Sequence, residues 1–405
     1  MNGQLADSQN GADSRHDVAV IGGGPAGLSG ALVLGRARRS VLVVDDGQPR
    51  NAPAEGVHGY LGHEGTPPAE LLATGRAEAG RYGARFRTGT VTDAVREDPH
   101  GFRLTLADGG TVRARRLLVT SGLTDELPDV PGLAGLWGRD VLHCPYCHGW
   151  EVRGQPIGIL GTGPLAVHQA LMWRQWSERV TLFLHTGPEP DDEQGEQLAA
   201  RGITVAAGEV TGVDTDGDGR LSGVRLASPA PDGSGGRQET AVLPCRALAV
   251  ATGLTARAGF LASLGLVPQP QEVNGTVIGS RIPADATGLT EVPGVWAAGN
   301  AAQVTEQVIG AAAAGVRAAA AINADLTAEE TRLAVAEWRA GRRATGLTEV
   351  PGVWAAGNAA QVTEQVIGAA AAGVRAAAAI NADLTAEETR LAVAEWRAGR
   401  RLPVP

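Results

Sequence analysis

The chain has 405 residues, of which 43% are apolar and 20% are charged, and its formal net charge is −9. At about 150 residues per domain this length predicts two or three domains, and the chain contains no run of about 18 apolar residues that could span a membrane. All 35 basic residues are arginine, which excludes a Schiff-base lysine and a phosphate-loop lysine, and an acidic chain without a basic run is poorly suited to bind nucleic acid.

Residues 1–16 are small and polar (MNGQLADSQNGADSRH) and contain no apolar stretch. Such a composition is typical of a disordered tail and lacks the apolar core of a secretory signal. We therefore expect this segment to be disordered and the protein to be cytoplasmic.

The first recognisable motif is a glycine-rich turn that directly follows an apolar strand, residues 17–21. It reads Gly22-x-Gly24-x-x-Gly27, opens a helical stretch, and is followed about twenty residues later by Asp45 at the end of the next apolar strand. In the dinucleotide-binding fold the first glycine permits the tight turn, the second lets a pyrophosphate approach the backbone, and the third lets the helix pack on the strand. Asp45 would accept hydrogen bonds from a ribose. The sequence therefore predicts a dinucleotide site here.

Two of the three cysteines form a Cys-x-x-Cys pair in the segment Cys144-Pro-Tyr-Cys147-His148. In an intracellular protein this spacing indicates redox chemistry or a metal site. Pro145 suits the first position of a helix, which puts Cys144 at a helix N-terminus that favours its thiolate, and His148 could supply or remove the proton. A structural zinc site needs four ligands, usually two such pairs, so we favour a redox role and expect no metal. The third cysteine, Cys245, is interpreted as a buried packing residue.

A second strand–turn–helix unit begins at the apolar strand 157–160 and reads Gly161-x-Gly163-x-x-Ala166. Alanine in the third place still allows close packing, so Gly161 and Gly163 are candidate NADP(H)-binding residues. The strand that should supply the ribose partner ends at His185, however, where NAD binding requires an acid and a 2′-phosphate requires an arginine. The residues that follow are acidic and would repel a phosphate. Either this unit binds NADP(H) or it keeps only the fold.

The segment Asp214-Thr-Asp216-Gly-Asp218-Gly219 resembles the start of a calcium-binding loop. Its twelfth position is Arg225, where such a loop needs a bidentate glutamate. We therefore interpret the segment as a hairpin turn.

Residues 286–343 recur without a difference as residues 344–401. Repeat architectures diverge and need three or more copies, so a single perfect copy indicates a recent duplication or an assembly fault in the sequence. Only one copy can occupy a given site in the fold. We expect it to be the first copy, because that copy follows its upstream strand without an insertion.

Taken together, these motifs resemble the low-molecular-weight thioredoxin reductase family of FAD-dependent pyridine nucleotide-disulfide oxidoreductases. The resemblance covers residues 15–343 and rests on VIGGGPAG, VVDDGQPRN, CPYCHGWE, GTGPLA and VPGVWAAGN. It implies FAD as the cofactor, held by Gly22, Gly24, Gly27, Asp45, Asn51, Gly299 and Asn300. Asn300 stands where the family usually has aspartate. The same resemblance implies that Cys147 faces the flavin and that Cys144 exchanges with the substrate.

Two strand–turn–helix units predict an α/β fold with two Rossmann-like doubly wound domains, one inserted into the other. We expect the chain to divide into a disordered tail over 1–16, the first part of an FAD-binding domain over 17–125, a smaller NAD(P)-type domain carrying the cysteine pair over 126–252, the second part of the FAD-binding domain over 253–343, and the duplicate with a short tail over 344–405.

Two departures from the thioredoxin reductases change the expected activity. Those enzymes have an acid directly after the second cysteine, where this chain has His148, and an arginine-rich site for the NADPH 2′-phosphate, which residues 184–193 lack. Both departures resemble the flavin dithiol oxidases of the gliotoxin and holomycin type. That resemblance implies oxidation of a small-molecule dithiol to a disulfide, with electrons passing to FAD and then to oxygen, and with His148 as the base on the substrate thiol.

Two other functions stay open on the sequence alone. The first is an NADPH-dependent disulfide reductase acting on thioredoxin or a similar protein, with His185 as a donor and arginines such as Arg174 or Arg179 on the phosphate. The second is a flavin-bound redox sensor without turnover, against which the intact cysteine pair argues. In each case we expect a homodimer that binds neither nucleic acid nor a membrane.

Overall fold

The computed structural model describes residues 15–98, 101–229, 237–273 and 275–344, together with the isolated positions 353, 376, 377, 380, 383, 384, 387 and 391. The chain forms two compact units, residues 1–323 and 324–405. All the strands of the described residues belong to the first unit.

A sheet of seven strands has the order β3-β2-β1-β6-β5-β4, with β19 pairing beside the C-terminal half of β6. Its strands are β1 (Arg15–Ile21), β2 (Val41–Asp45), β3 (Arg85–Thr88), β4 (Val91–Asp98), β5 (Gly101–Leu106), β6 (Thr111–Val119) and β19 (Val295–Ala297). The pairs β1–β2, β2–β3, β1–β6 and β6–β19 are parallel, and β4 and β5 extend the sheet antiparallel. Apolar residues fill the C-terminal part of β1 and most of β2 because parallel strands are covered on both faces.

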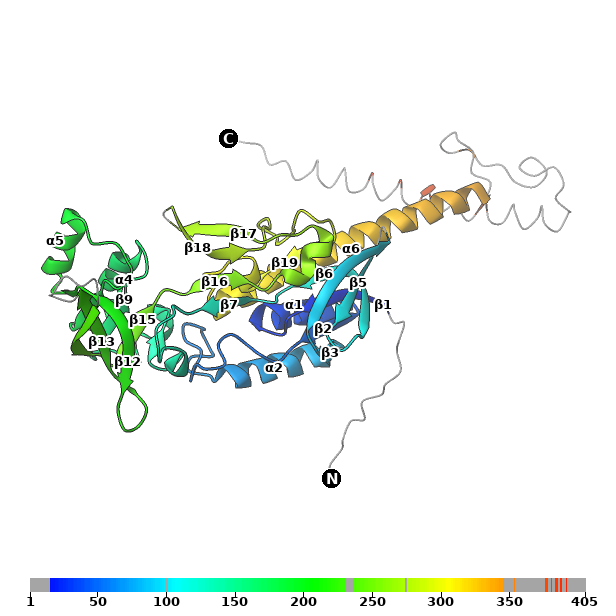
Figure 1. Cartoon of the computed structure of the whole chain (residues 1–405). Helices are drawn as coiled ribbons and strands as arrows, with labels where there is room; N and C mark the ends of the chain where they lie inside the picture. The colour runs from blue at the N-terminus through cyan, green and yellow to red at the C-terminus, as the bar shows by residue number, and fades with distance from the viewer. Residues whose placement is uncertain are drawn as a thin grey trace, which may run out of the picture. The chain divides into compact units, whose positions relative to one another are not determined.

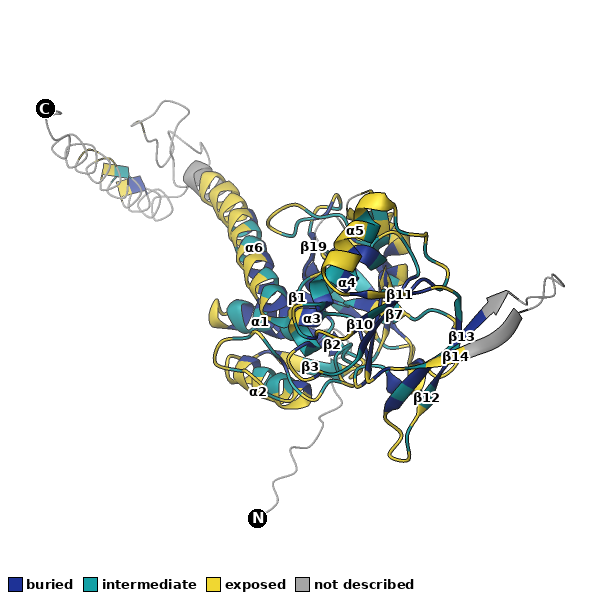
Figure 2. Cartoon of the chain, turned by 90° about the vertical axis from the view of Figure 1, so that its left-hand side faces the viewer, coloured by how far each residue is buried: buried dark blue, intermediate teal, exposed yellow. Residues whose placement is uncertain are grey.

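Two helices cover this sheet. Helix α1 (Pro25–Arg36) packs on β1, β2 and β6, and α2 (Pro68–Arg81) packs on α1 (Figure 1). The outer side of α2 is exposed (Figure 2), and its buried residues are Pro68 and Ala79. The first sheet, α1 and α2 together form the mononucleotide-binding half of the predicted doubly wound fold.

The expected disordered tail is wrong at its C-terminal end. Strand β1 begins at Arg15, which pairs with Arg113 of β6, and His16 is buried beside Ala114. Both residues are polar, so the apolar pattern that marked the strand begins only after them. Residues 1–14 lie outside the described residues.

A second, wholly parallel sheet has the order β11-β10-β9-β15-β8. Its strands are β8 (Val141–Leu142), β9 (Ile157–Leu160), β10 (Val180–Phe183), β11 (Thr204–Ala206) and β15 (Ala247–Val250), and its helices are α4 (Ala166–Trp173) and α5 (Asp192–Ala200). An antiparallel sheet of β12 (Glu209–Thr215), β13 (Leu221–Pro229) and β14 (Arg237–Pro244) follows β11. The predicted second strand–turn–helix unit is therefore present.

The chain passes from the first sheet to the second through β7 (Leu123–Glu126) and returns through β16 (Gly253–Ala256). These two strands pair antiparallel, with Thr124 opposite Thr255, and β17 (Gln269–Val273) and β18 (Thr276–Arg281) complete a four-stranded sheet. Short 3₁₀ turns occupy Ala134–Leu136 (η1), Gly259–Leu264 (η2) and Gly299–Ala301 (η3). The α/β class and its two Rossmann-like units are as the sequence predicts.

The first copy of the internal repeat supplies β19 and η3 and begins helix α6 (Val308–Ala344). Strand β19 pairs with Leu117–Val119 of β6, so the expectation that the first copy completes this sheet is confirmed. The second copy lies outside the described residues except at isolated positions. Within the described ranges, no helix combines the length and the apolar character needed to cross a bilayer.

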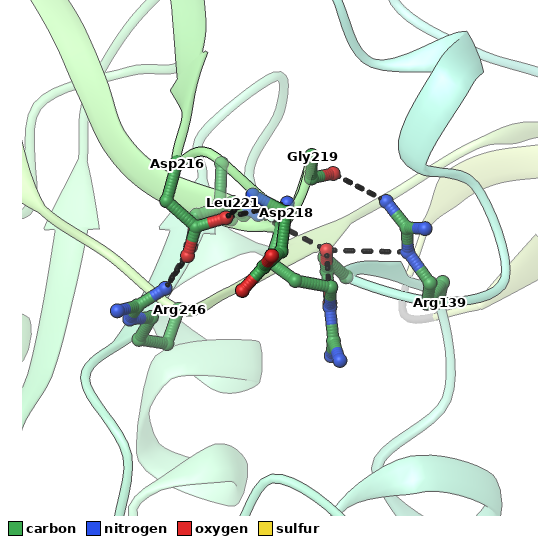
Figure 3. Close-up of polar contacts among 8 residues, drawn as sticks. Arg139, Asp216, Asp218, Gly219, Leu221 and Arg246 are labelled. Atoms are coloured by element: carbon green, nitrogen blue, oxygen red, sulfur yellow. Dashed lines mark hydrogen bonds and ion pairs between the residues drawn. The ribbon is translucent and has the colours of Figure 1, made fainter.

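The acidic segment that resembles a calcium loop is the turn of the β12–β13 hairpin, as predicted. The Asp216 carboxylate accepts hydrogen bonds from the backbone N–H groups of Asp218 (3.1 Å) and Arg220 (3.0 Å), and it forms an ion pair with Arg246 at 2.6 Å (Figure 3). These bonds close a short turn around the carboxylate.

The same hairpin is bound to the segment that leads into the cysteine pair. Asp140, which is 1% exposed and directly precedes β8, accepts hydrogen bonds from the Nε and Nη2 groups of Arg220 and from the Leu221 N–H at 3.0 Å. Arg139 donates to the Gly219 carbonyl (Figure 3). Burial by itself would raise the pKa of Asp140, but these bonds outweigh it and lower the pKa. The carboxylate is therefore charged and fixes the start of β8.

Candidate active site

A cavity of about 830 Å³ in the first unit brings together residues from nine separate stretches of the chain. The predicted site residues that line it are Gly22, Gly24, Asp45, Asn51, Cys144, Cys147, His148, Gly299 and Asn300. Gly27 lies beneath the turn rather than on the cavity wall, and Gly161 and Gly163 do not line it. The first glycine turn, the cysteine pair and the late Gly-Asn segment thus share one space.

The turn between β1 and α1 has the glycine pattern that sterics require. Gly22 has φ +107°, and a Cβ there would collide with the Thr120 carbonyl oxygen. A Cβ on Gly27 would collide with the Gly22 carbonyl oxygen, so the helix can approach the strand only without a side chain. Gly24, by contrast, has no atom within 4 Å of its Cβ position, which leaves room for a ligand beside the start of α1 at Pro25.

Asp45 closes this end of the cavity. Its carboxylate accepts a hydrogen bond from the Gly23 N–H at 2.8 Å and an ion-paired bond from Arg76 at 2.8 Å. Arg76 comes from α2 and was not foreseen in the sequence, because it carries no motif. The carboxylate has further lone pairs with which it could accept from a ribose hydroxyl.

Gly299 and Asn300 also line the cavity, just before α6. Gly299 has φ +66°, and the Asn300 amide nitrogen donates to the carbonyl oxygens of Gln303, Val304 and Glu306 at 3.3, 3.1 and 3.0 Å. An aspartate could not make these bonds, because a carboxylate has no donor. The Asn300 amide group therefore stabilises the loop through its nitrogen, and its Oδ1 remains available as an acceptor.

The cysteine pair lies on the short helix α3 (Pro145–His148). Pro145 is the first helical residue and Cys144 is the N-cap, as predicted. The Cys147 thiol donates a hydrogen bond to the Cys144 sulfur, with the two Sγ atoms 2.9 Å apart. That bond, with the backbone N–H groups of Cys147 and Tyr146, lowers the pKa of Cys144 to about 7 against the effect of burial. The same bond and burial raise the pKa of Cys147, so Cys144 is the thiolate of the pair.

His148 ends α3 and lines the cavity with both cysteines. Burial lowers its pKa, His58 and His143 add to that effect, and the Glu151 carboxylate opposes it. A neutral imidazole at neutral pH is the form that can accept a proton.

An ion pair next to the cysteines was missed at the sequence level. Arg50 donates two hydrogen bonds to Asp125, at 2.6 and 2.7 Å, and the Thr252 hydroxyl donates to the same carboxylate. The Arg50 charge adds to the lowering of the Cys144 pKa and opposes the rise of the Cys147 pKa. The only signal was its place beside Asn51 in the VVDDGQPRN motif. Directly before Cys144, the buried Nδ1 of His143 has no hydrogen-bond partner among the described residues.

The second glycine turn has a different environment. The loop after β10 folds back onto it, so that the N–H groups of Thr186 (3.2 Å) and Gly187 (2.8 Å) donate to the Gly161 carbonyl oxygen. His185 has φ +48°, and its Nδ1 accepts a hydrogen bond from the Val210 N–H. The loop thus uses this ring nitrogen to hold the backbone, where the sequence offered His185 only as a ligand donor.

The fold and the cavity define a flavoprotein oxidoreductase of the two-Rossmann class, and the comparisons identify its family. Residues 16–315 match the family model described as pyridine nucleotide-disulphide oxidoreductase, so the chain belongs to that family. Members of this family that resemble thioredoxin reductase bind FAD. This chain fits FAD: the open Gly24 position, the Asp45 carboxylate and the volume of the cavity suit a dinucleotide.

Among its relatives, the thioredoxin reductase sirT of Leptosphaeria maculans is 31% identical over 323 residues, which is 76% of this chain and 93% of sirT. The crystal structure of HlmI is 41% identical, with a TM-score of 0.72, and the match covers 85% of this chain and 100% of HlmI. The oxidoreductase from Agrobacterium tumefaciens is 34% identical, with a TM-score of 0.67, over 78% of this chain and 99% of that protein.

Other relatives match over less of their length. The thioredoxin reductase tcpT of Claviceps purpurea is 37% identical over 49% of this chain and 62% of tcpT. The chain spans 39% of a probable thioredoxin reductase of Arthroderma benhamiae and 58% of aclD of Aspergillus oryzae. Although these relatives match only in part, the family model covers most of the chain.

Proposed function

We propose that this protein is an FAD-dependent dithiol oxidase, which converts a small-molecule dithiol into a disulfide with oxygen as the final acceptor. One observation carries the proposal: a thiol pair, a histidine base and a dinucleotide-type glycine turn line the same cavity. Gly22, Gly24, Gly27, Asp45, Asn51, Gly299 and Asn300 would hold the cofactor. When bound, FAD supplies the two-electron acceptor, and its reoxidation by oxygen gives hydrogen peroxide.

The reaction uses the Cys144–Cys147 pair in its disulfide form as the first oxidant. His148 takes the proton from one substrate thiol, and the resulting thiolate attacks the Cys144 sulfur, with the electron pair leaving on Cys147. The second substrate thiol then attacks the substrate sulfur of this mixed disulfide, and the electron pair leaves on Cys144. Its low pKa makes Cys144 a good leaving group. The products are the substrate disulfide and the enzyme dithiol.

The alternative is an NADPH-dependent disulfide reductase acting on a thioredoxin-like protein, which the names of the relatives sirT and tcpT favour. Against it stand the residues that would have to bind the nucleotide. Arg174 donates to the carbonyl oxygens of Arg201 and Ser177, and Arg179 donates to that of Gly154. The carboxylates Asp191, Asp192 and Glu193 cap and begin α5, where they would repel a 2′-phosphate.

We further propose that the partner is a small dithiol rather than a protein, that the protein is a cytoplasmic homodimer, and that the domains divide at residues 125, 252 and 343. The size of the partner is supported by the position of the two thiols, which are partly buried inside the cavity. The domain division is supported by the pairing of β7 with β16, where the chain leaves and re-enters the first sheet.

Stopped-flow reduction of the bound flavin tests the proposal. Anaerobic dithiothreitol should bleach the flavin absorbance rapidly, whereas NADPH and NADH should do so at least a hundredfold more slowly. Cys147→Ser should keep its FAD and lose the response to dithiols, with Cys245→Ser as the matched control that reacts like the wild type. Rapid bleaching by NADPH would instead establish the reductase.

A further inference from the structure

Besides His148 and His143, one more histidine lines the cavity and has no part in the chemistry above. His58 lies in the loop between β2 and α2, where Val57 and Thr66 form an isolated antiparallel bridge. The Val57 N–H donates to the Thr66 carbonyl oxygen, and the Gly65 N–H donates to that of Val57, both at 2.8 Å. Residues 57–66 therefore form a closed loop, and His58 follows its buried first residue.

Glu64, from the far end of the same loop, fixes the His58 ring. One carboxylate oxygen of Glu64 lies 2.7 Å from the His58 Nδ1, and the other accepts from the Gly59 N–H at 2.9 Å. The bond to His58 lowers the pKa of Glu64, so this group is a carboxylate that can only accept. Nδ1 must then carry the hydrogen, which leaves Nε2 with a free lone pair in the neutral ring.

The free Nε2 atom faces the segment that carries the cysteines. It lies 3.7 Å from a carboxylate oxygen of Glu151, three residues after His148. The Glu151 carboxylate also raises the pKa of His148, whereas His58 lowers it. Glu151 thus lies within electrostatic reach of both imidazoles and would stabilise a proton on either one.

The proposed reaction has two protons to place. Closing a substrate dithiol to a disulfide on the Cys144–Cys147 disulfide requires two thiolate attacks, and each attacking thiol must lose its proton. His148 holds one proton at a time. A second base on the same cavity would let the second thiol ionise before His148 has released the first proton to solvent.

We propose that His58 is this second proton acceptor, with its Nδ1 bonded to Glu64 and its Nε2 directed toward Glu151, the carboxylate that also acts on His148. This inference rests on the proposed dithiol oxidation. In the first attack the proton goes to His148, and in the second attack it goes to His58 Nε2, beside the Glu151 carboxylate. The two electrons of the substrate remain on the enzyme dithiol, as in the scheme above. His58 is 21% exposed at its side chain, so it can return the proton to water.

The test is the pH dependence of flavin reduction by dithiothreitol in the FAD-loaded protein. At pH 7, His58→Gln should slow the reduction at least tenfold, in keeping with the usual contribution of a general base. The defect should shrink as the pH rises past about 8.5, the pKa of an ordinary thiol, because an ionised thiol needs no base. Added imidazole should restore part of the rate in His58→Ala.

His63→Gln is the matched control. His63 belongs to the same loop but does not line the cavity, and its ring packs edge-on against Tyr60 at 5.0 Å. This variant should react like the wild type at every pH. Absorbance spectra of the purified variants report whether FAD is still bound.

The outcomes separate this inference from the function on which it rests. If dithiothreitol fails to reduce the wild-type flavin, the proposed function fails. If the wild type reacts and His58→Gln reacts equally fast, or is slowed by the same factor at every pH, His58 is not a proton acceptor and the inference alone is overturned.

Discussion

The two glycine turns of this protein share a motif and differ in what surrounds them. At Gly22–Gly27 the turn opens onto a large cavity, with Asp45 at its edge. At Gly161–Ala166 the loop after β10 packs on the turn, and its N–H groups bond the Gly161 carbonyl oxygen. The motif therefore specifies a strand–turn–helix geometry in both places, whereas the surrounding segments decide which turn borders the large cavity.

The largest expected effect comes from adding one methyl group to each turn. Gly27→Ala places a Cβ against the Gly22 carbonyl oxygen, so the helix and strand must separate. We expect a loss of about 2–3 kcal/mol of stability and most of the bound FAD. Gly163→Ala meets no atom within 4 Å and should change stability by less than about 0.5 kcal/mol. Thermal melting and flavin absorbance measure both. Equal losses in the two variants would contradict the steric constraint assigned to Gly27 and the open position of Gly163.

A second prediction compares the cysteines of the two regions. Cys144 borders the cavity and has its pKa lowered to about 7, while burial raises the pKa of Cys245, in the second sheet's core, to about 12. In the reduced protein, the rate of Cys144 alkylation by iodoacetamide should rise as the pH increases through about 7 and then level off, because the thiolate is the reactive form. Cys245 should stay unmodified at these pH values. Peptide mass spectrometry distinguishes the sites, and a Cys144 rate that keeps rising to pH 9 would refute the lowered pKa.

The smallest effect concerns the two copies of the repeat. Asn300→Ala removes three hydrogen bonds from the loop before α6, and we expect the affinity for FAD to fall about tenfold, since such bonds are each worth about 1 kcal/mol and water replaces part of them. Asn358→Ala makes the same change in the identical second copy and should leave the affinity unchanged. FAD titration of the apoprotein compares the two. A loss in the second variant alone would mean that the second copy occupies the site.

The sequence predicted those parts of the site that depend on neighbours along the chain. The Gly22–Gly27 turn, Asp45 at the end of its strand, and Cys144 as the N-cap before Pro145 all follow from local backbone geometry. It also predicted the hairpin at Asp214–Gly219. It did not predict that β1 begins at Arg15, because polar residues at the edge of a strand give no apolar signal.

The remaining contacts join residues far apart in the sequence. Arg50 and Asp125 are separated by 75 positions, Arg76 and Asp45 by 31, and Arg220 and Asp140 by 80. Each is a pair of charged residues that are common on protein surfaces, and no spacing rule connects them. Each of these ion pairs forms only once the two sheets and their connecting loops are in place.

The sequence by itself determined the chain's α/β class, its two glycine turns and the presence of a thiol pair at a helix N-terminus, because each depends on steric and hydrogen-bonding preferences within a few residues. Only the tertiary structure decided which turn opens onto a cavity, which arginine lies near the cysteine pair, and which histidines line the cavity. Those properties depend on burial and on charges brought together from distant segments, and both are set by how the sheets and loops pack.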